Sequence, residues 1–316
     1  MPVPTILSRG KFLDMRVVVT GGTGFIGRAL CAALAADGHD VVVLSRFAGG
    51  TYMNVRHVRA QVLHDRFEAQ GASEIDGADA VINLAGAGIA DARWSAARKA
   101  LLHYSRLSVT RAVVAGIKEA AVPPAVLLSG SAIGYYGSDL NATFDESSPA
   151  GGDFLAGLCA DWEAAAREAE SETTRVVLLR TGLVLARDGG LISKLKPPFR
   201  FFVGGPTGSG RQWMSWIHRD DWIAMVRWAL TTSTVRGALN VVAPTPVINR
   251  AFSAAFGAAL HRPSLLPLPA FVLRLMFGEL ADVALLASQK VTPRVATTGG
   301  FAFKYSDVDS ALKAAV

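Results

Sequence analysis

The most constraining feature of the chain is a glycine-rich turn between three consecutive valines (residues 17–19) and an amphipathic helix. In this spacing Gly21 permits a tight turn, Gly24 lets a pyrophosphate approach the backbone, and Gly27 lets the helix lie close to the strand. Free N–H groups and the positive dipole end of that helix then face the anion. The residues predicted to bind the cofactor here are Gly21, Thr23, Gly24, Phe25, Ile26 and Gly27.

Glycine spacing alone is weak evidence of dinucleotide binding, so the secondary structure predicted around the turn has to support it. An apolar helical pattern follows it, Gly38 is placed to end that helix, and residues 41–44 form a second apolar strand. A complete strand–helix–strand unit predicts dinucleotide binding; the alternative is a glycine turn of an unrelated α/β protein.

The end of the second strand indicates which dinucleotide binds. An NAD site usually carries Asp or Glu there for the ribose 2′-hydroxyl, whereas this chain has Ser45 and Arg46. A guanidinium can pair with a 2′-phosphate and a serine hydroxyl can donate to it, so NADP(H) is the predicted cofactor. The alternative is that Arg46 is only a solvated surface residue.

Apolar strands and amphipathic helices continue to alternate along the chain, which is typical of a parallel sheet covered on both faces. We predict an α/β fold: a doubly wound parallel sheet (Rossmann fold) with a smaller, mainly helical C-terminal lobe. Further strands are expected within 57–63 and at 80–84, 125–129 and 175–179, with helices at about 93–120 and 154–170. The cofactor-binding domain is assigned to 15–186 and the substrate-side lobe to 187–316, whose strands return to the main sheet, and residues 1–14 to a disordered extension or a misassigned start.

Composition excludes several classes of protein. The net charge of +6 includes no basic block, so nucleic acid is not an expected partner. The two cysteines, Cys31 and Cys159, form neither a disulfide framework nor a metal-ligand spacing, so we expect a cytoplasmic protein without metal. The uncharged stretch 120–138 contains two prolines and three glycines, which argues against a membrane span. The expected partner is a small-molecule substrate, and a homodimer is left open.

With these segments located, the chain resembles the extended short-chain dehydrogenase/reductase superfamily, and within it the epimerase-family proteins that carry a distinctive C-terminal domain. The resemblance spans almost the whole length. The matching segments are 20–27, 45–46, 83–86, 105–106, 131–137, 154–163, 180–185, 204–221 and the punctuated tail to Leu312.

The resemblance implies further cofactor contacts. Leu84, Ala85 and Gly86 would run beneath the nicotinamide ribose and adenine side, unless Gly86 is only a loop glycine. Arg106 would lie near the cofactor phosphates or ribose, with a plain surface arginine as the alternative. Val184 would follow a strand where relatives place backbone contacts to the carboxamide.

The chain departs from the superfamily at its catalytic pair. Ordinary members use Tyr-x-x-x-Lys on a helix, where the lysine lowers the tyrosine pKa. No tyrosine here has lysine four residues later, and no lysine lies between Lys118 and Lys194. Aligning by Trp162 and Glu163 puts Leu155 and Cys159 at the two positions.

The remaining catalytic candidates are Ser131, Tyr135 and Tyr136, just past the fifth strand. In relatives a serine there hydrogen-bonds the substrate oxygen; the register also leaves Ser129 open, and we count it among the cofactor-binding residues. Either tyrosine could replace the missing acid. Cys159 could act as a weak acid, although a small packed residue is the simpler interpretation.

The segment 208–221 offers a second set of polar residues. Arg211 and Gln212 could contact a substrate phosphate or sugar, or belong to a structural loop. Asp220 or Asp221 is expected to cap a helix over 222–230. His218 and Asp221 lack the further ligands of a metal site.

These observations predict an NADP(H)-dependent epimerase or oxidoreductase acting on a carbinol or ketone carbon of a sugar-nucleotide-like or other small polar substrate. The competing hypothesis is a non-catalytic NADP(H)-binding redox sensor or scaffold, which the missing pair motivates. A weaker third idea, an RNA-associated protein, is disfavoured by the absence of a basic stripe.

Overall fold

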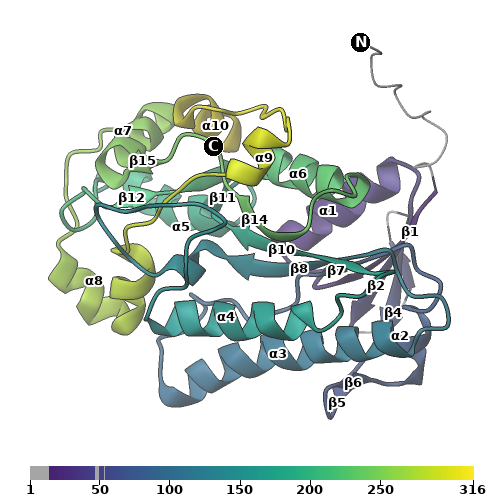
Figure 1. The fold of residues 1–316 in the computed structure, drawn as a ribbon. Coiled ribbons are helices and arrows are strands. Elements are labelled where there is room, and N and C mark those ends of the chain that lie inside the picture. The colour runs from purple at the N-terminus through teal and green to yellow at the C-terminus, as the bar shows by residue number, and fades with distance from the viewer. Residues whose placement is uncertain (1–13, 47–49, 53) are drawn as a thin grey trace.

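The computed structural model of the chain describes residues 14–46, 50–52 and 54–316. Apart from Asp14, the segment predicted as an extension lies outside the described residues. A central eight-stranded sheet has the order β14-β10-β8-β7-β1-β2-β4-β3, parallel except for β3 (Figure 1). Its strands are β1 Arg16–Thr20, β2 Asp40–Ser45, β3 Gly50–Tyr52, β4 Val55–Arg59, β7 Ala80–Asn83, β8 Val126–Ala132, β10 Arg175–Thr181 and β14 Gly237–Val241.

Helices cover both faces of the sheet, which confirms the predicted doubly wound fold. The helices α1 (Phe25–Ala36) and α6 (Arg219–Thr231) lie on one face, and α3 (Ala96–Glu119) and α4 (Phe154–Arg167) lie on the other (Figure 1). Successive strand residues point to opposite faces, so the run of valines in β1 supplies Val17 and Val19 to one apolar core and Val18 to the other. Continuous apolar strands are therefore buried on both sides.

The third strand lies earlier than the predicted range of 57–63, because it begins at Val55. It ends at Arg59, and Val62 and Leu63 form β5 (Val62–Leu63) of a separate hairpin with β6 (Arg66–Phe67). The edge strand β3 was not predicted, because three residues beginning with glycine carry no periodic pattern. A short helix, α2 (Ala69–Ser73), follows the hairpin.

The region after residue 186 forms the mainly helical lobe and also returns β14 and α6 to the main sheet. Its other helices are α5 Gly190–Arg200, α7 Asn249–Leu260, α8 Ala270–Phe277, the π-helix η2 Ala281–Leu285, α9 Arg294–Thr298 and α10 Val308–Ala315. Two short strand pairs connect segments before and after residue 186: β11 Leu183–Leu185 with β13 Trp216–His218, and β9 Thr143–Phe144 with β16 Lys290–Val291. A third pair, β12 Trp213–Met214 with β15 Val247–Ile248, lies within the region after residue 186. Pro197 and Pro198 lie in the last turn of α5, although two consecutive prolines favour a loop.

The expected aspartate cap of the helix over 222–230 is wrong. Helix α6 begins at Arg219, and its cap is His218, whose Nδ1 accepts the N–H of Asp220 at 3.2 Å. Asp221 is instead buried and accepts the N–H groups of Lys304 and Tyr305, both at 2.8 Å. Local propensity favours an aspartate cap, but here the carboxylate anchors the C-terminal tail, a tertiary contact that sequence periodicity does not reveal.

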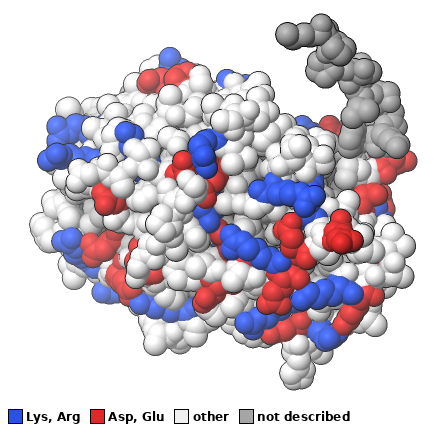
Figure 2. All heavy atoms as spheres, in the orientation of Figure 1, with Lys and Arg blue, Asp and Glu red and all other residues white. Residues whose placement is uncertain are grey.

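Acidic and basic side chains interleave over the face that carries α3 and α4 (Figure 2). Within the described ranges, no helix has the length and apolar character that a bilayer crossing needs. The same residues contain no cluster of three or more histidine, cysteine or carboxylate side chains that could hold a metal ion.

Candidate functional site

The glycine turn after β1 leaves no space for a side chain at Gly21 or Gly27. Gly21 has a φ of +72°, and a Cβ there would lie 2.6 Å from the carbonyl carbon of Leu84. A Cβ on Gly27 would lie 2.2 Å from the Gly21 oxygen, so the start of α1 packs directly on the turn. Gly24 donates its N–H to that same oxygen at 3.0 Å. The sequence requires glycine at 21 and 27 for packing alone, independently of any ligand.

The N-terminus of α1 is open to an anion. Gly24 precedes the helix without a side-chain cap, and the first turn carries no acidic residue. Thr23 and Gly24 are exposed, and Phe25 and Ile26 are half-buried. Uncapped N–H groups at the end of a helix form a natural phosphate site, so this turn fits a dinucleotide pyrophosphate.

Two arginines lie at the carboxyl end of β2, and the sequence predicted only one of them, Arg46. Arg46 is exposed there, and the register of β2 with β4 places Arg59 opposite Ser45. Within the described part of the chain, neither Arg46 nor Arg59 pairs with a carboxylate. Arg59 was missed because only the strand register brings it beside Ser45. Two unpaired guanidinium groups at this position fit a 2′-phosphate.

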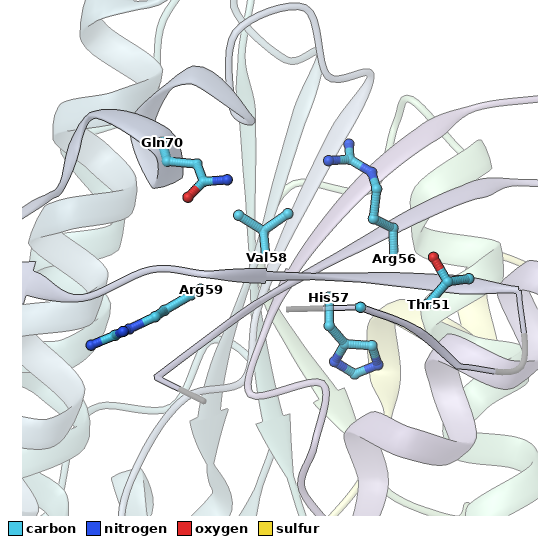
Figure 3. Close-up of a pocket in the computed structure, with 7 residues that line it drawn as sticks. Thr51, Arg56, His57, Val58, Arg59 and Gln70 are labelled. Carbon is cyan, nitrogen blue, oxygen red and sulfur yellow. The ribbon is translucent and has the colours of Figure 1, made fainter. Parts of the chain in front are cut away.

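A hollow of about 420 Å³ adjoins this end of the sheet, around β3, β4 and Gln70 (Figure 3). Arg56 and Val58 project from one side of β4, and His57 and Arg59 project from the other (Figure 3). Arg56 is engaged by two hydrogen bonds of 2.7 Å to Glu74. Of the side chains around the hollow, Arg59 therefore adds free positive charge.

The loop after β7 passes over the turn and is held by α3. Leu84 donates its N–H to the Thr20 oxygen at 3.0 Å, and Ala87 donates to Ser105 Oγ at 3.1 Å. Leu84 and Ala85 are half-buried and Gly86 is exposed. The backbone at 84–86 thus lies beside the glycine turn.

Arg106 lies on α3 directly beside Gly86. A Cβ on Gly86 would be 3.2 Å from Arg106 Cζ, and the guanidinium also lies over the Trp162 ring, 5.3 Å from its centroid. Arg106 Nη1 donates a hydrogen bond to the Leu102 oxygen at 3.1 Å. Burial lowers the pKa of Arg106, and among the described residues no carboxylate pairs with it. A largely buried cation without an anion is costly unless a ligand neutralises it.

Ser131 belongs to a buried ionic network. Its hydroxyl donates to Glu163 Oε1 at 2.8 Å, and Glu163 is fully buried on α4. Arg180 of β10 binds both oxygens of Glu163, with Nε at 2.7 Å and Nη2 at 2.9 Å. The charge-assisted bonds outweigh the effect of burial and raise the pKa of Arg180 above its ordinary value. The sequence motif containing Glu163 was noted, but no role was assigned to it or to Arg180.

The two tyrosines differ in their environments. Tyr136 is buried, donates its hydroxyl to Asn240 Oδ1 at 2.6 Å and accepts from Arg180 Nη1 at 2.9 Å. Burial raises the pKa of Tyr136 to about 12. Tyr135 is half-buried, and the Arg180 Cζ lies 3.5 Å from its ring centroid. Tyr135 therefore has the more available hydroxyl.

The positions aligned with the missing pair face this network. Leu155 and Cys159 are both buried on α4, and Leu155 Cβ lies 3.3 Å from where a Cβ of Gly134 would be. Burial raises the pKa of the Cys159 thiol to about 11, which favours a packed residue over an acid or nucleophile. Ser129 Oγ is fully buried and has no hydrogen-bond partner in the part of the chain described.

Two further predictions are placed by the structure. Val184 is buried on β11; a Cβ on Gly190 would lie 3.3 Å from the Val184 oxygen and 2.8 Å from Phe25, which brings β11 close to the glycine turn. Gln212 is buried and donates to the Thr207 backbone and hydroxyl oxygens, both at 3.0 Å, which favours its structural role. Arg211 is exposed.

Comparisons with known proteins agree with this architecture. The profile of the NAD dependent epimerase/dehydratase family matches residues 17–242, and a domain of unknown function, DUF1731, matches residues 268–315. The epimerase family protein SDR39U1 homolog of Arabidopsis thaliana is 42% identical over 98% of this chain and 89% of its own length. The epimerase family protein SDR39U1 of Homo sapiens is 38% identical over 95% of this chain and 99% of its own.

Solved structures show the same relationship. The crystal structure of human SDR39U1 with NADPH has a TM-score of 0.86, with 37% identity, 95% coverage of this chain and 99% of that one. MoeE5 with UDP-glucuronic acid and NAD has a TM-score of 0.74 at 20% identity over 94% of this chain and 96% of that one, which shows the fold alone. Because the family profile spans more than half of the chain and close relatives cover nearly all of it, the chain belongs to the NAD dependent epimerase/dehydratase family.

Proposed function

We propose that this protein binds NADP(H) and acts as an epimerase or oxidoreductase at a hydroxyl or ketone carbon of a sugar-nucleotide-like or other small polar substrate. The observation that carries the cofactor is the uncapped N-terminus of α1 behind the glycine turn, with Ser45 and two arginines that pair with no carboxylate of the described residues at the adjacent strand ends. The 37% identical relative crystallised with NADPH supports the same ligand.

In this proposal, separate residues bind the cofactor and handle the substrate proton. The backbone of the turn receives the pyrophosphate, Arg46 and Arg59 bind the 2′-phosphate, and Arg106 binds the ribose or phosphates beside Gly86. Bound NADP(H) would supply hydride transfer at nicotinamide C4. Ser131, whose proton is directed to Glu163, accepts a hydrogen bond from the substrate hydroxyl, and Tyr135 holds or passes the proton at its phenolic oxygen.

The first test is whether freshly purified protein retains nicotinamide cofactor and how quickly labelled NADPH exchanges with it. Slow exchange is expected for an epimerase, because its cycle returns the hydride within one turnover. Fast exchange is expected for a dehydrogenase that releases its cofactor each cycle, or for a sensor. Failure to bind NADPH at all would contradict the proposal.

Arg46→Ala is expected to weaken NADPH roughly tenfold to hundredfold, as loss of a charge-assisted hydrogen bond does, and NADH much less. Arg59→Ala should show the same selectivity with a smaller loss, because Arg59 lies on the neighbouring strand. Both effects are measured as dissociation constants by cofactor fluorescence. Arg211→Ala, an exposed arginine of the C-terminal lobe, is the control. Equal losses for NADPH and NADH would contradict the 2′-phosphate assignment.

The tyrosines form a matched pair for the catalytic role. Tyr135→Phe and Ser131→Ala are each expected to lower turnover at least about 100-fold while NADPH affinity stays unchanged. Tyr136→Phe should chiefly lower stability, because it breaks buried hydrogen bonds to Asn240 and Arg180. Turnover on carbonyl compounds found by screening is followed by NADPH absorbance, and epimerisation of sugar nucleotides, which consumes no NADPH, is followed by separating the two epimers. Full activity of both Ser131→Ala and Tyr135→Phe would refute the assigned roles.

A redox sensor is the second candidate, favoured by the burial of Leu155 and Cys159 where a catalytic pair would lie. In that case NADPH and NADP⁺ stabilise different conformations. Limited proteolysis with each cofactor measures this difference, and identical cleavage patterns would count against the sensor.

A further inference from the structure

The indole of Trp162 lies between β8 of the sheet and Arg106 of α3, and no role proposed above uses it. Its side chain is buried on α4, and a Cβ on Gly130 of β8 would lie 2.8 Å from Trp162 Cη2. The Arg106 guanidinium lies over the same ring, 5.3 Å from its centroid. Helices α3 and α4 run side by side on this face of the sheet (Figure 1). Trp162 therefore fills the space between the sheet and Arg106.

A buried threonine fixes the orientation of the indole. Trp162 Nε1 donates to Thr110 Oγ1 at 2.8 Å, and Asn83 Nδ2 donates to the same oxygen, also at 2.8 Å. Asn83 Oδ1 in turn accepts the Thr20 hydroxyl at 2.6 Å. A hydroxyl oxygen has two acceptor lone pairs, so both donors can bind Thr110 at once. This buried network ties the ring to the carboxyl ends of β1 and β7, where the glycine turn begins.

Arg106 is held by groups that do not neutralise its charge. The face of an aromatic ring attracts a cation, and the Leu102 carbonyl accepts a hydrogen bond from Arg106 Nη1 at 3.1 Å. None of the carboxylates in the described part of the chain pairs with Arg106. A guanidinium carries five N–H donors in one plane, so stacking on a ring leaves donors at its edge for a ligand. A carboxylate would hold the side chain but would also cancel the charge that an anionic ligand needs.

Adjacent residues of α4 hold two arginines in different ways. Glu163 binds Arg180 through both carboxylate oxygens, which neutralises that cation inside the protein. Trp162 holds Arg106 beside Gly86 without an ion pair. The contrast indicates that Arg180 serves the buried network, whereas Arg106 keeps its charge for a ligand.

We propose that Trp162 is a positioning residue, which holds the Arg106 guanidinium beside Gly86 by stacking while Thr110 fixes its own ring. The inference rests on the proposed role of Arg106 in binding the ribose or phosphates of the cofactor. Trp162 acts through Arg106 and not on the cofactor itself. Helix α4, which lacks the usual catalytic pair, thus contributes to cofactor binding through a different residue.

The first test compares dissociation constants of NADPH for the full chain, measured by cofactor fluorescence. Trp162→Leu removes the ring and should weaken NADPH about threefold to thirtyfold, the range of a cation–π contact. Trp162→Phe keeps an aromatic face and should lose less. Trp222→Phe is the matched control, because Trp222 is also buried and donates Nε1 to a threonine, Thr181 Oγ1, at 3.1 Å. Its NADPH affinity should equal that of wild type; a loss in Trp222→Phe as large as in Trp162→Leu would overturn the proposal.

The dependence on Arg106 separates positioning from a general loss of structure. In the Arg106→Leu background, Trp162→Leu should change NADPH affinity by less than about twofold, because the two residues act as one unit. An undiminished loss in that background would overturn the proposal, since Trp162 would then act without Arg106.

A measurement without cofactor distinguishes failure of this inference from failure of the proposed function. The Arg106 Nε–H resonance is identified in spectra of arginine-labelled protein by its loss in Arg106→Leu. It should move in Trp162→Leu and in Thr110→Val, which removes the acceptor of the indole, and stay in place in Thr110→Ser, which keeps it. A resonance that moves in neither of the first two variants would overturn the positioning role. A resonance that moves as expected, with wild-type NADPH affinity in Arg106→Leu, would support the positioning role and refute the cofactor contact of Arg106.

Discussion

Arg180→Leu is expected to lower the free energy of unfolding by about 3–5 kcal/mol, the largest single loss we predict for this protein. The substitution leaves Glu163, which is fully buried, without the guanidinium that binds both of its oxygens. The buried carboxylate then keeps its desolvation cost and loses most of its compensation, because the half-exposed Arg167 and the Ser131 hydroxyl are what it retains. Equilibrium urea unfolding with cofactor absent measures the effect.

Arg167 provides the matched control, because it pairs with the same carboxylate at 3.0 Å from a side chain that is 48% exposed. Arg167→Ala should cost less than about 1 kcal/mol, since solvent screens the pair. The double variant Arg180→Leu/Glu163→Leu should recover part of the loss, because no buried charge remains. Equal losses for Arg167→Ala and Arg180→Leu would show that burial does not decide the strength of these pairs.

Arg106→Leu is expected to change stability and cofactor affinity in opposite directions. The cation is half-buried beside Gly86 and pairs with no carboxylate of the described residues, so its removal should leave the melting temperature of the cofactor-free protein unchanged or higher. NADPH affinity should fall about tenfold to hundredfold, the effect of losing a charge-assisted hydrogen bond. A purely structural arginine would lower the melting temperature instead.

A shorter ligand locates the contact. Adenosine 2′,5′-bisphosphate has the 2′-phosphate but lacks the pyrophosphate link and the nicotinamide ribose, so Arg106→Leu should bind it as wild type does. Arg46→Ala should weaken both ligands. If Arg106→Leu weakened the bisphosphate as strongly as NADPH, its place near the ribose or pyrophosphate would be wrong.

The cofactor half of the molecule could be predicted from local patterns. The valine run of β1, the glycines at 21 and 27 and the end of β2 act within one strand–helix–strand unit, so their spacing carries the geometry. Arg59 was not predicted as a cofactor-binding candidate, because its position beside Ser45 depends on which strand pairs with β2. Residue spacing does not encode that pairing.

The half of the molecule proposed to be catalytic depends on contacts between distant residues. Ser131, Glu163 and Arg180 are separated by 17 to 49 positions, yet they share one buried network. The roles of His218 and Asp221 could not be predicted for a similar reason. The backbone groups that Asp221 binds lie more than 80 residues away in the sequence. Polar side chains give no periodic signal, so only their assembly shows which are paired and which remain available.

The sequence by itself determined the doubly wound fold, the position of the glycine turn and the absence of a Tyr-x-x-x-Lys pair. These features depend on residue order and local spacing, which fix hydrophobic periodicity and backbone freedom. Tertiary structure alone decided that Tyr136 is locked by Asn240 and Arg180, that Tyr135 stays available, and that Arg106 is half-buried with no carboxylate partner among the described residues. Burial and electrostatic pairing arise between segments remote in the chain, so they exist only once the sheet and its helices have packed together.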